Sequence, residues 1–210
     1  MLIARRDLVA GAVAATAGSA ALAKTLVATS SQVLGPFYPV IHPADSDADL
    51  TRVRGRRGIA AGQPIRVIGR IVDLHGNPVR GARIDLWQAN ALGRYDHPGD
   101  RANRAALDPN FQGFGRLVAD RQGEFRFRSI KPAAYDSPIG MRTPHIHFSI
   151  DGRNERLVTQ MYFPGEALND RDMLLKAADH RETLVAQAVG RAADDARALA
   201  YRWTVVLTNG

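Results

Sequence analysis

Short runs of alternating apolar and polar residues, separated by turn-forming pairs, are the feature that most restricts how this chain can fold. Alternation with a period of two is typical of a strand with one buried face. It is clearest where Ile65, Val67 and Ile71 fall on one side of an extended segment. Strands are predicted at residues 64–71, 79–87, 116–120, 124–130, 144–150, 158–163 and 201–207. The pattern predicts an all-β fold, an antiparallel β-sandwich of about seven to eight strands.

The segments between these runs carry their own predictions. The turn at residues 75–78, His-Gly-Asn-Pro, predicts a β-hairpin between the first two strands. Residues 93–115 are rich in Gly, Asp, Asn, Pro and Arg and predict a long loop, which in a compact domain usually has a function. One helix is predicted in the C-terminal half, between residues 170 and 189. Its imperfect apolar stripe consists of Leu174, Leu175, Ala178, Leu184, Val185 and Ala188.

The 210 residues divide into three parts. Residues 1–23 carry Arg5 and Arg6, a weakly apolar stretch and an Ala-Leu-Ala end, which predicts a cleaved twin-arginine signal peptide and a periplasmic or secreted protein. Residues 24–61 lack periodicity and predict an extended arm. Residues 62–210 form the predicted catalytic β-sandwich domain. Without the leader, no membrane span is expected.

Composition excludes several classes of protein. The chain has no cysteine, so disulfides, thiolate metal sites and cysteine nucleophiles are excluded. The net charge of +7 comes from scattered arginines without a basic block, so no nucleic-acid partner is expected. A basic surface that favours anionic small molecules is the milder interpretation.

His145 and His147 lie on one face of the predicted strand 144–150, because alternate side chains of a strand point the same way. This spacing alone is moderate evidence for a metal site. Two tyrosines lie outside the alternating runs, Tyr95 in the long loop and Tyr135 after Lys131-Pro132. Phenolate is a hard anionic ligand that suits Fe(III) better than Zn(II), so the combination indicates iron.

Several motifs in a fixed order resemble those of the intradiol ring-cleavage dioxygenases. They are GPFYP at 35–39, LWQAN at 86–90, GRY at 93–95, DPNFQGFGR at 108–116, IKP at 130–132 and HIHF at 145–148. The resemblance extends over nearly all of residues 34–207. It implies a mononuclear non-haem Fe(III) held by Tyr95, Tyr135, His145 and His147. It also implies that Tyr135 leaves iron when substrate binds.

The same resemblance implies an activity. Catechol-type rings are cleaved with O₂ between the two hydroxyl-bearing carbons, which gives a cis,cis-muconate-type diacid. Arg142 corresponds to an arginine that stabilises the substrate as it becomes ketone-like, and Gln160 to a polar partner behind the site. The arm is too short for the helical domain of enzymes that act on plain catechol, which favours a protocatechuate-like substrate. Protocatechuate enzymes contain two related chains, so an iron-bearing chain is expected in a homo-oligomer or with a related chain.

The sequence departs from the family pattern near the expected substrate entrance. Ala133 stands where glycine is usual, and Asp136-Ser137 follows Tyr135 where proline and an aromatic residue are common. The connection from Tyr135 to Arg142 is also short. These changes affect the prediction of which ring substituent the substrate carries more than the prediction of the iron site.

Two other interpretations remain at this stage. Residues 69–82 also look like the hairpin of transthyretin-like and carboxypeptidase-regulatory domains, which are non-catalytic binding modules. Convergence of the two tyrosines and two histidines would distinguish the enzyme from the module. A cupin-like oxygenase is the other alternative, but its carboxylate and third histidine are missing, since the only later histidine is His180.

Overall fold

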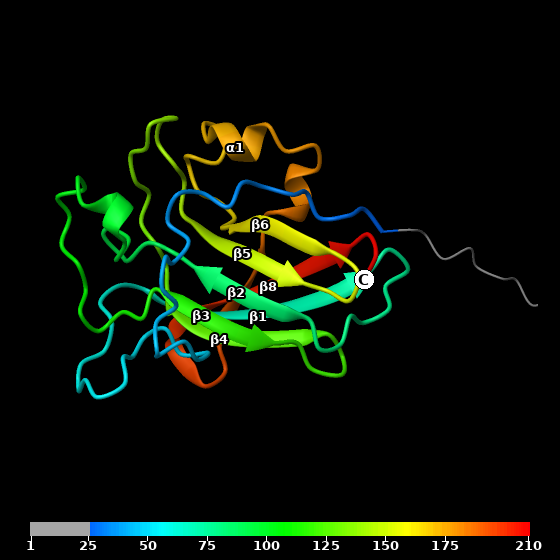
Figure 1. The fold of residues 1–210 in the computed structure, drawn as a ribbon, viewed down its shortest axis with the longest axis horizontal. Helices are drawn as coiled ribbons and strands as arrows, with labels where there is room; N and C mark the ends of the chain where they lie inside the picture. The colour runs from blue at the N-terminus through cyan, green and yellow to red at the C-terminus, as the bar shows by residue number, and fades with distance from the viewer. Residues whose placement is uncertain (1–25) are drawn as a thin grey trace, which may run out of the picture.

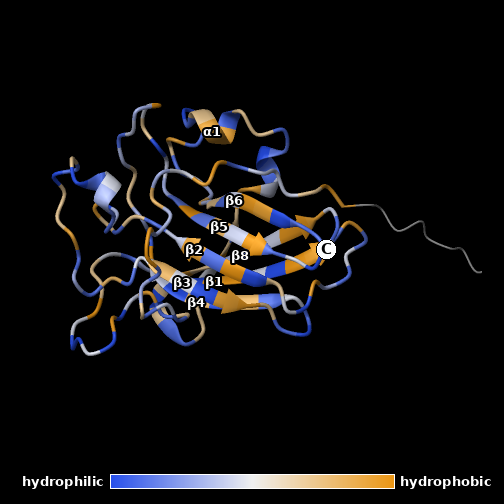
Figure 2. Cartoon of the chain, viewed as in Figure 1, coloured by the Kyte–Doolittle hydropathy of each residue, from blue (hydrophilic) through white to orange (hydrophobic). Residues whose placement is uncertain are grey.

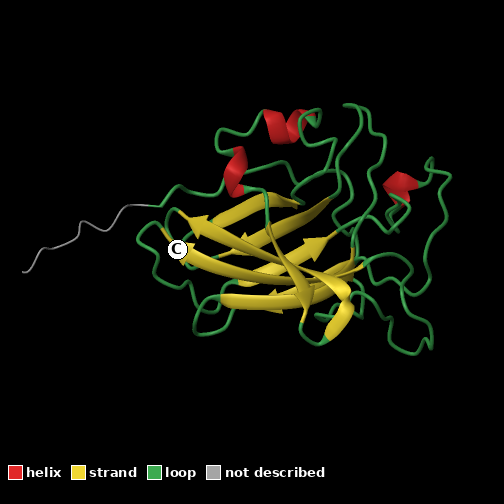
Figure 3. Cartoon of the chain, turned by 180° about the vertical axis from the view of Figure 1, so that it is seen from behind, coloured by secondary structure: helices red, strands yellow, loops and turns green. Residues whose placement is uncertain are grey.

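The computed structural model describes residues 26–210, and these form a sandwich of two four-stranded sheets (Figures 1 and 3). One sheet has the strand order β4-β1-β8-β7 and the other β3-β2-β5-β6. The strands are β1 Pro64–Asp73, β2 Arg83–Trp87, β3 Phe114–Val118, β4 Glu124–Ile130, β5 His145–Asp151, β6 Arg156–Tyr162, β7 Gln187–Ala192 and β8 Asp195–Leu207. The all-β sandwich and the expected strand number are confirmed. The predicted signal peptide lies outside the described residues.

The core lies between the sheets and is built from alternate residues of their strands (Figure 2). On β5, Ile146, Phe148 and Ile150 are fully buried in it. Phe148 contacts the rings of Phe127 and Trp203 from the opposite sheet, with centroids 6.1 and 4.9 Å apart. Because these residues point inward, the side chains between them on β5 point away from the core.

The predicted hairpin between the first two strands is confirmed only at its turn, where Val72 forms an antiparallel bridge with Pro78 and Val79 N donates to Ile71 O. The predicted pairing of the two strands beyond the turn is wrong. β1 pairs with β4 and β8, whereas β2 pairs with β3 and β5 in the other sheet. The turn at residues 75–78 therefore carries the chain from one sheet to the other. Moreover, β1 and β8 are parallel, so the sandwich is not wholly antiparallel. Alternation sets which face of a strand is buried, but it does not select the neighbouring strand.

The predicted helix over 170–189 is also wrong in extent. The segment contains the short helix α1 Met173–Lys176, a 3-10 turn Arg181–Thr183 and the start of β7. Tyr162 at the end of β6 donates its N–H to Leu184 O and accepts from Ala186 N. The edge backbone groups of Tyr162 thus bind residues 184 and 186 and place Val185 in a parallel bridge with Tyr162, and this pairing overrides an imperfect helical stripe.

The arm that precedes β1 packs along the edges of the sandwich. Gln32 N donates to Val158 O on β6, Leu50 N donates to Arg128 O on β4, and Arg116 N on β3 donates to Ser46 O. Leu50 is fully buried in the core. The long loops gather at the end of the sandwich opposite the C-terminus, where β5 begins (Figure 1). Within residues 26–210, no helix has the length and apolar character needed to cross a membrane.

Candidate active site

The start of β5 presents His145 and His147 on the face opposite the core. Each is only 2% exposed, and their Nε2 atoms lie 3.2 Å apart. His145 Nδ1 is 2.6 Å from Thr143 O. A carbonyl oxygen can only accept, so Nδ1 carries the proton and Nε2 of the neutral ring keeps its lone pair. His145 therefore directs a nitrogen with a free lone pair towards Nε2 of His147, and the two Nε2 atoms lie at one point.

Tyr135 lies beside these histidines. Its hydroxyl is 3.4 Å from His145 Nε2. Its backbone pairs with Arg142 through two hydrogen bonds, Tyr135 N to Arg142 O at 3.2 Å and Arg142 N to Tyr135 O at 2.8 Å. The connection between them is thus a short hairpin that leads directly into β5, with Tyr135 only partly buried.

Tyr95 comes from the long loop and completes the cluster. Its ring centroid lies 5.6 Å from that of Tyr135 and 6.4 Å from that of His147. Asn90 Oδ1 accepts from the N–H of Leu92 and Arg94, which folds the loop back on itself. All four residues predicted as metal ligands therefore converge, although they come from three separate segments.

Three buried polar atoms of the cluster have no hydrogen-bond partner among the described residues. They are Tyr95 Oη, His147 Nδ1 and Trp87 Nε1. A buried hydroxyl without a partner costs free energy and marks a place where a ligand or ion can bind. No group of three or more His, Asp or Glu side chains in the described part of the chain could hold a metal ion. A metal at this site would consequently need the tyrosines.

Burial sets the protonation of these groups. Burial, followed by the charge of Arg142, lowers the pKa of His145 to about 3. Burial and then the charge of His145 lower the pKa of His147. Burial also raises the pKa of Tyr95 well above its usual value and raises that of Tyr135. The site thus holds neutral imidazoles and, without a cation, protonated phenols.

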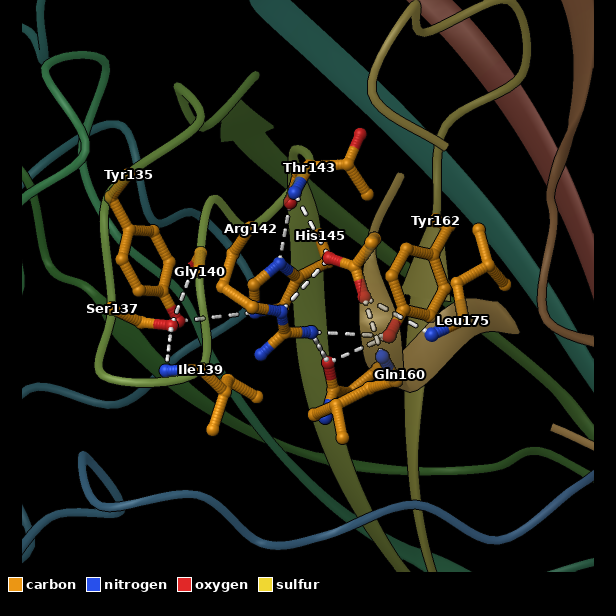
Figure 4. Close-up of polar contacts among 12 residues, drawn as sticks. Tyr135, Ser137, Ile139, Gly140, Arg142, Thr143, His145, Gln160, Tyr162 and Leu175 are labelled. Atoms are coloured by element: carbon orange, nitrogen blue, oxygen red, sulfur yellow. Dashed lines mark hydrogen bonds and ion pairs between the residues drawn. The ribbon is translucent and has the colours of Figure 1, made fainter. Parts of the chain in front are cut away.

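Arg142 lies beside the cluster and is 5% exposed (Figure 4). Its Nη2 donates to Gln160 Oε1 at 2.7 Å and to Tyr162 Oη at 3.2 Å. Its Nε donates to Asp172 Oδ2 at 2.8 Å. The structure therefore places both Arg142 and Gln160 next to the four residues: Gln160 accepts from Arg142 and lies opposite His147 in the pairing of β5 with β6.

Sequence reasoning missed several residues of this site. The position of Tyr162 in the alternating strand 158–163 predicts a core tyrosine, yet its hydroxyl contacts Arg142 and donates to Gln32 Oε1 at 2.7 Å. Trp87 stacks on His147 at a centroid distance of 5.0 Å, and Phe37 stacks on Tyr95 at 4.4 Å. The motifs that contain Phe37 and Trp87 were noticed, but nothing in them indicated these contacts. For Asp172, an Asp before a Met-Leu-Leu run is a helix N-cap signal that could have been found.

Comparisons with known proteins agree with this geometry. A family model described as Dioxygenase matches residues 33–209. The chain is 40% identical over 179 residues to the protocatechuate 3,4-dioxygenase beta chain of Burkholderia cepacia, which covers 82% of this chain and 76% of that protein. It is 33% identical over 168 residues to the hydroxyquinol 1,2-dioxygenase of Nocardioides simplex, with 72% of this chain covered and 53% of that relative, about half its length.

A solved structure gives the same result. The dioxygenase domain of a dioxygenase carbohydrate-binding protein fusion from Streptomyces sp. SirexAA-E has a TM-score of 0.65 to this chain at 26% identity. The match covers 87% of this chain and 99% of that one. The non-catalytic module and the cupin-like oxygenase are therefore not retained. The chain belongs to the intradiol ring-cleavage dioxygenase family of enzymes.

Proposed function

We propose that Tyr95, Tyr135, His145 and His147 hold a mononuclear Fe(III) and that the chain cleaves a catechol-type ring between its two hydroxyl-bearing carbons. The donors fit this ion. Two neutral imidazoles are in the form that ligates metals, and the unpartnered hydroxyl of Tyr95 is a buried oxygen in need of a partner. Phenolate oxygens suit a hard trivalent cation, and a cation here would offset the rise that burial causes in the tyrosine pKa.

The two tyrosines differ in a way that supports different roles. Tyr95 is 4% exposed and lies under the stacked ring of Phe37, so it is held in place. Tyr135 is only partly buried and sits on a short hairpin. Tyr135 would therefore be the tyrosine that makes room for substrate, and its phenolic oxygen would be placed to accept a catechol proton. When bound, Fe(III) acts as a Lewis acid that lowers the pKa of a catechol hydroxyl and activates the ring towards O₂.

Arg142 supplies the permanent positive charge of the site. Two of its three guanidinium nitrogens are occupied by Asp172, Gln160 and Tyr162, and Nη1 forms no hydrogen bond among the described residues. A guanidinium stays charged at all relevant pH values, so it can stabilise the negative charge that develops on the substrate ring as one C–O bond becomes ketone-like. Gln160 supports this role by accepting from Nη2. The products expected are cis,cis-muconate-type diacids, with both atoms of O₂ incorporated.

A protocatechuate-like substrate is favoured for two reasons. The relative from Burkholderia cepacia acts on protocatechuate by name and is 40% identical. The net charge of +7 favours a carboxylated, anionic catechol. Because that relative is called a beta chain, a related second chain is the proposed partner, with a homo-oligomer as the other possibility.

Visible absorption spectroscopy tests the proposal most directly. The aerobically purified protein should show a tyrosinate-to-Fe(III) band that shifts when protocatechuate is added without O₂. Tyr95→Phe should change the band and abolish ring cleavage, whereas Tyr201→Phe, in the core beside Phe163, should change neither. A colourless protein with stoichiometric iron would contradict the two-tyrosinate site. Catechol, hydroxyquinol and protocatechuate compared as substrates would decide the ring preference.

A further inference from the structure

Asp172 is a buried carboxylate with four donors and no assigned role. It is fully buried and lies 30 residues after Arg142 in the chain. Its Oδ2 accepts from Arg142 Nε at 2.8 Å and from Thr143 N at 3.0 Å. Its Oδ1 accepts from Leu174 N and Leu175 N at 3.0 and 3.1 Å, as the N-cap of α1. One carboxylate thus joins α1 to the residues that lead into β5.

The two oxygens of Asp172 perform separable tasks. Oδ1 only caps α1, a task that a serine side chain performs about as well. Oδ2 contacts the guanidinium and the backbone just before His145. The contacts of Oδ2 indicate that Asp172 has a role in the site beyond capping α1, because capping a helix of four residues does not require a buried ion pair.

The contacts of Arg142 leave one orientation for its guanidinium. Asp172 accepts from Nε on one side, and Gln160 and Tyr162 accept from Nη2 on the other. These acceptors come from three places, since Asp172 precedes α1, whereas Gln160 and Tyr162 lie on β6. Nη1 is therefore the only nitrogen of the group without a hydrogen bond in the described part of the chain. Because a guanidinium is planar and rigid, hydrogen bonds at Nε and Nη2 also fix the direction in which Nη1 points.

The guanidinium of Arg142 lies beside the four candidate ligands. Its Nη2 donates to Tyr162, whose ring centroid lies 5.7 Å from that of His145, and to Gln160, the cross-strand partner of His147. The guanidinium therefore lies close enough to act on groups bound there. Its direction matters for the same reason, because electrostatic stabilisation depends on where the donors point before the reaction begins.

We infer that Asp172 is a positioning residue for ring cleavage: it clamps Arg142 so that Nη1 alone faces the ligand cluster and the bound ring. This inference rests on the proposed function. Asp172 does not touch the reacting atoms. Its effect passes through Arg142, and it couples the start of α1 to the chemistry of the site.

Asp172→Ser separates the two tasks, since serine keeps the cap of α1 but is too short to reach Arg142. In the iron-loaded full chain, kcat for protocatechuate should fall on the order of 10- to 100-fold, as for other misplaced catalytic groups. The dissociation constant for protocatechuate, measured without O₂, should change less than about threefold, because holding Arg142 in place mainly stabilises the transition state rather than the bound substrate. Met173→Gly, at a 60% exposed position of α1, is the control for a weakened helix and should keep kcat near wild type.

A double-mutant cycle tests whether the effect passes through Arg142. Asp172→Ser should lower kcat in the wild-type background and cause no further loss in an Arg142→Gln background, because the group it positions is already gone. Equal losses in both backgrounds would overturn the inference, as would a kcat for Asp172→Ser within about threefold of wild type.

A measurement without turnover separates this inference from the proposed function. In the metal-free full chain labelled with ¹⁵N-arginine, Arg142 should give a slowly exchanging Nε–H resonance, identified by its loss in Arg142→Gln. The resonance should disappear in Asp172→Ser and persist in Met173→Gly, and its persistence in Asp172→Ser would overturn the clamp. If Asp172→Ser does not fold, Asp172→Thr, which also caps a helix but is too short to reach Arg142, replaces it in both measurements. A wild-type chain that shows the resonance but cleaves no catechol would refute the proposed function and leave the clamp intact.

Discussion

Gly93 is the residue that allows the loop of Tyr95 to meet the segment of Tyr135. Its φ of +75° lies in the left-handed region. A Cβ at this position would lie 2.6 Å from Ala134 O and 3.1 Å from Tyr135 Cβ. The nearest of these atoms belongs to the backbone and cannot rotate away. Gly55 has a similar φ of +81° but nothing within 4 Å of its would-be Cβ, so the two glycines differ only in the space around them.

Gly93→Ala is expected to destabilise the protein more than Gly55→Ala. Both variants lose about 1 kcal/mol or more because alanine is strained in the left-handed region. Gly93→Ala should cost about 1–3 kcal/mol beyond that, because the added methyl overpacks the contact. Urea denaturation of the metal-free protein measures both. Equal free energies of unfolding for the two variants would contradict the close approach seen between the two loops.

At the scale of elements, the arm is attached to the sheet next to the site through Asp85 on β2. Tyr38 Oη donates to Asp85 Oδ2 at 2.8 Å, and Arg116 on β3 donates to both oxygens at 2.7 and 2.8 Å. Burial raises the pKa of Asp85, but the hydrogen bonds from Arg116 and Tyr38 outweigh it and the net pKa is lowered. Since Phe37 stacks on Tyr95, this attachment also holds the arm against the site.

The lowered pKa of Asp85 predicts a pH-dependent contribution to stability. The folded pKa lies below the unfolded value of about 3.9, so the contribution is fully present above that pH and is lost as pH falls through the folded pKa. Asp85→Asn should lower the free energy of unfolding by about 1 kcal/mol at pH 7. This difference should shrink below about pH 4.

Urea denaturation between pH 3 and 7 checks this, with Asp151→Asn as the control. Asp151 is more exposed, and its ion pairs with Arg83 and Arg156 are 3.6 and 3.5 Å long. Such surface pairs contribute about 0–1 kcal/mol, so the control should change little. A loss in Asp85→Asn that stayed constant down to pH 3 would refute a contribution from the ionised carboxylate.

At the scale of the whole molecule, the sandwich gathers into one place residues that lie far apart in the chain. The loop after β2 supplies Tyr95, the connection from β4 to β5 supplies Tyr135, and β5 supplies the histidines. The arm adds Phe37, and Asp172 comes from the N-cap position of α1. The site thus depends on every layer of the fold, and a change in any of these segments should affect it.

The pair Arg5-Arg6 predicts export of the folded protein through the twin-arginine route. Replacing both with lysine should keep the protein in the cytoplasm, because this route reads the paired arginines themselves rather than their charge. Arg56→Lys with Arg57→Lys, an adjacent exposed pair in the arm, is the matched control and should not alter export. Cell fractionation with N-terminal sequencing checks both the location and cleavage after Ala23. Equal amounts of the first variant and wild type in the periplasm would contradict this route.

Much of the fold and the candidate site could be predicted from the sequence, because those parts depend on patterns among residues close together in the chain. Alternation predicted the strands, and it placed His145 and His147 on the face away from Phe148. The ordered motifs predicted the family. The pairing of β1 with β2 was wrong because two alternating segments look the same whether or not they pair with each other. The helix over 170–189 was wrong because the edge of β6 binds Leu184 and Ala186 through the backbone of Tyr162, which ends helical structure there.

The sequence by itself determined the fold class, the absence of thiolate chemistry and the residue types available for a metal. Only the tertiary structure decided that Tyr95 and Tyr135 meet the histidines, that the hydroxyl of Tyr95 has no partner in the described residues, and that Asp172 holds Arg142. The physical reason is distance along the chain. Side-chain periodicity acts over a few residues, whereas Arg142 and Asp172, 30 residues apart, form a buried ion pair only because tertiary packing brings the start of β5 and the start of α1 together.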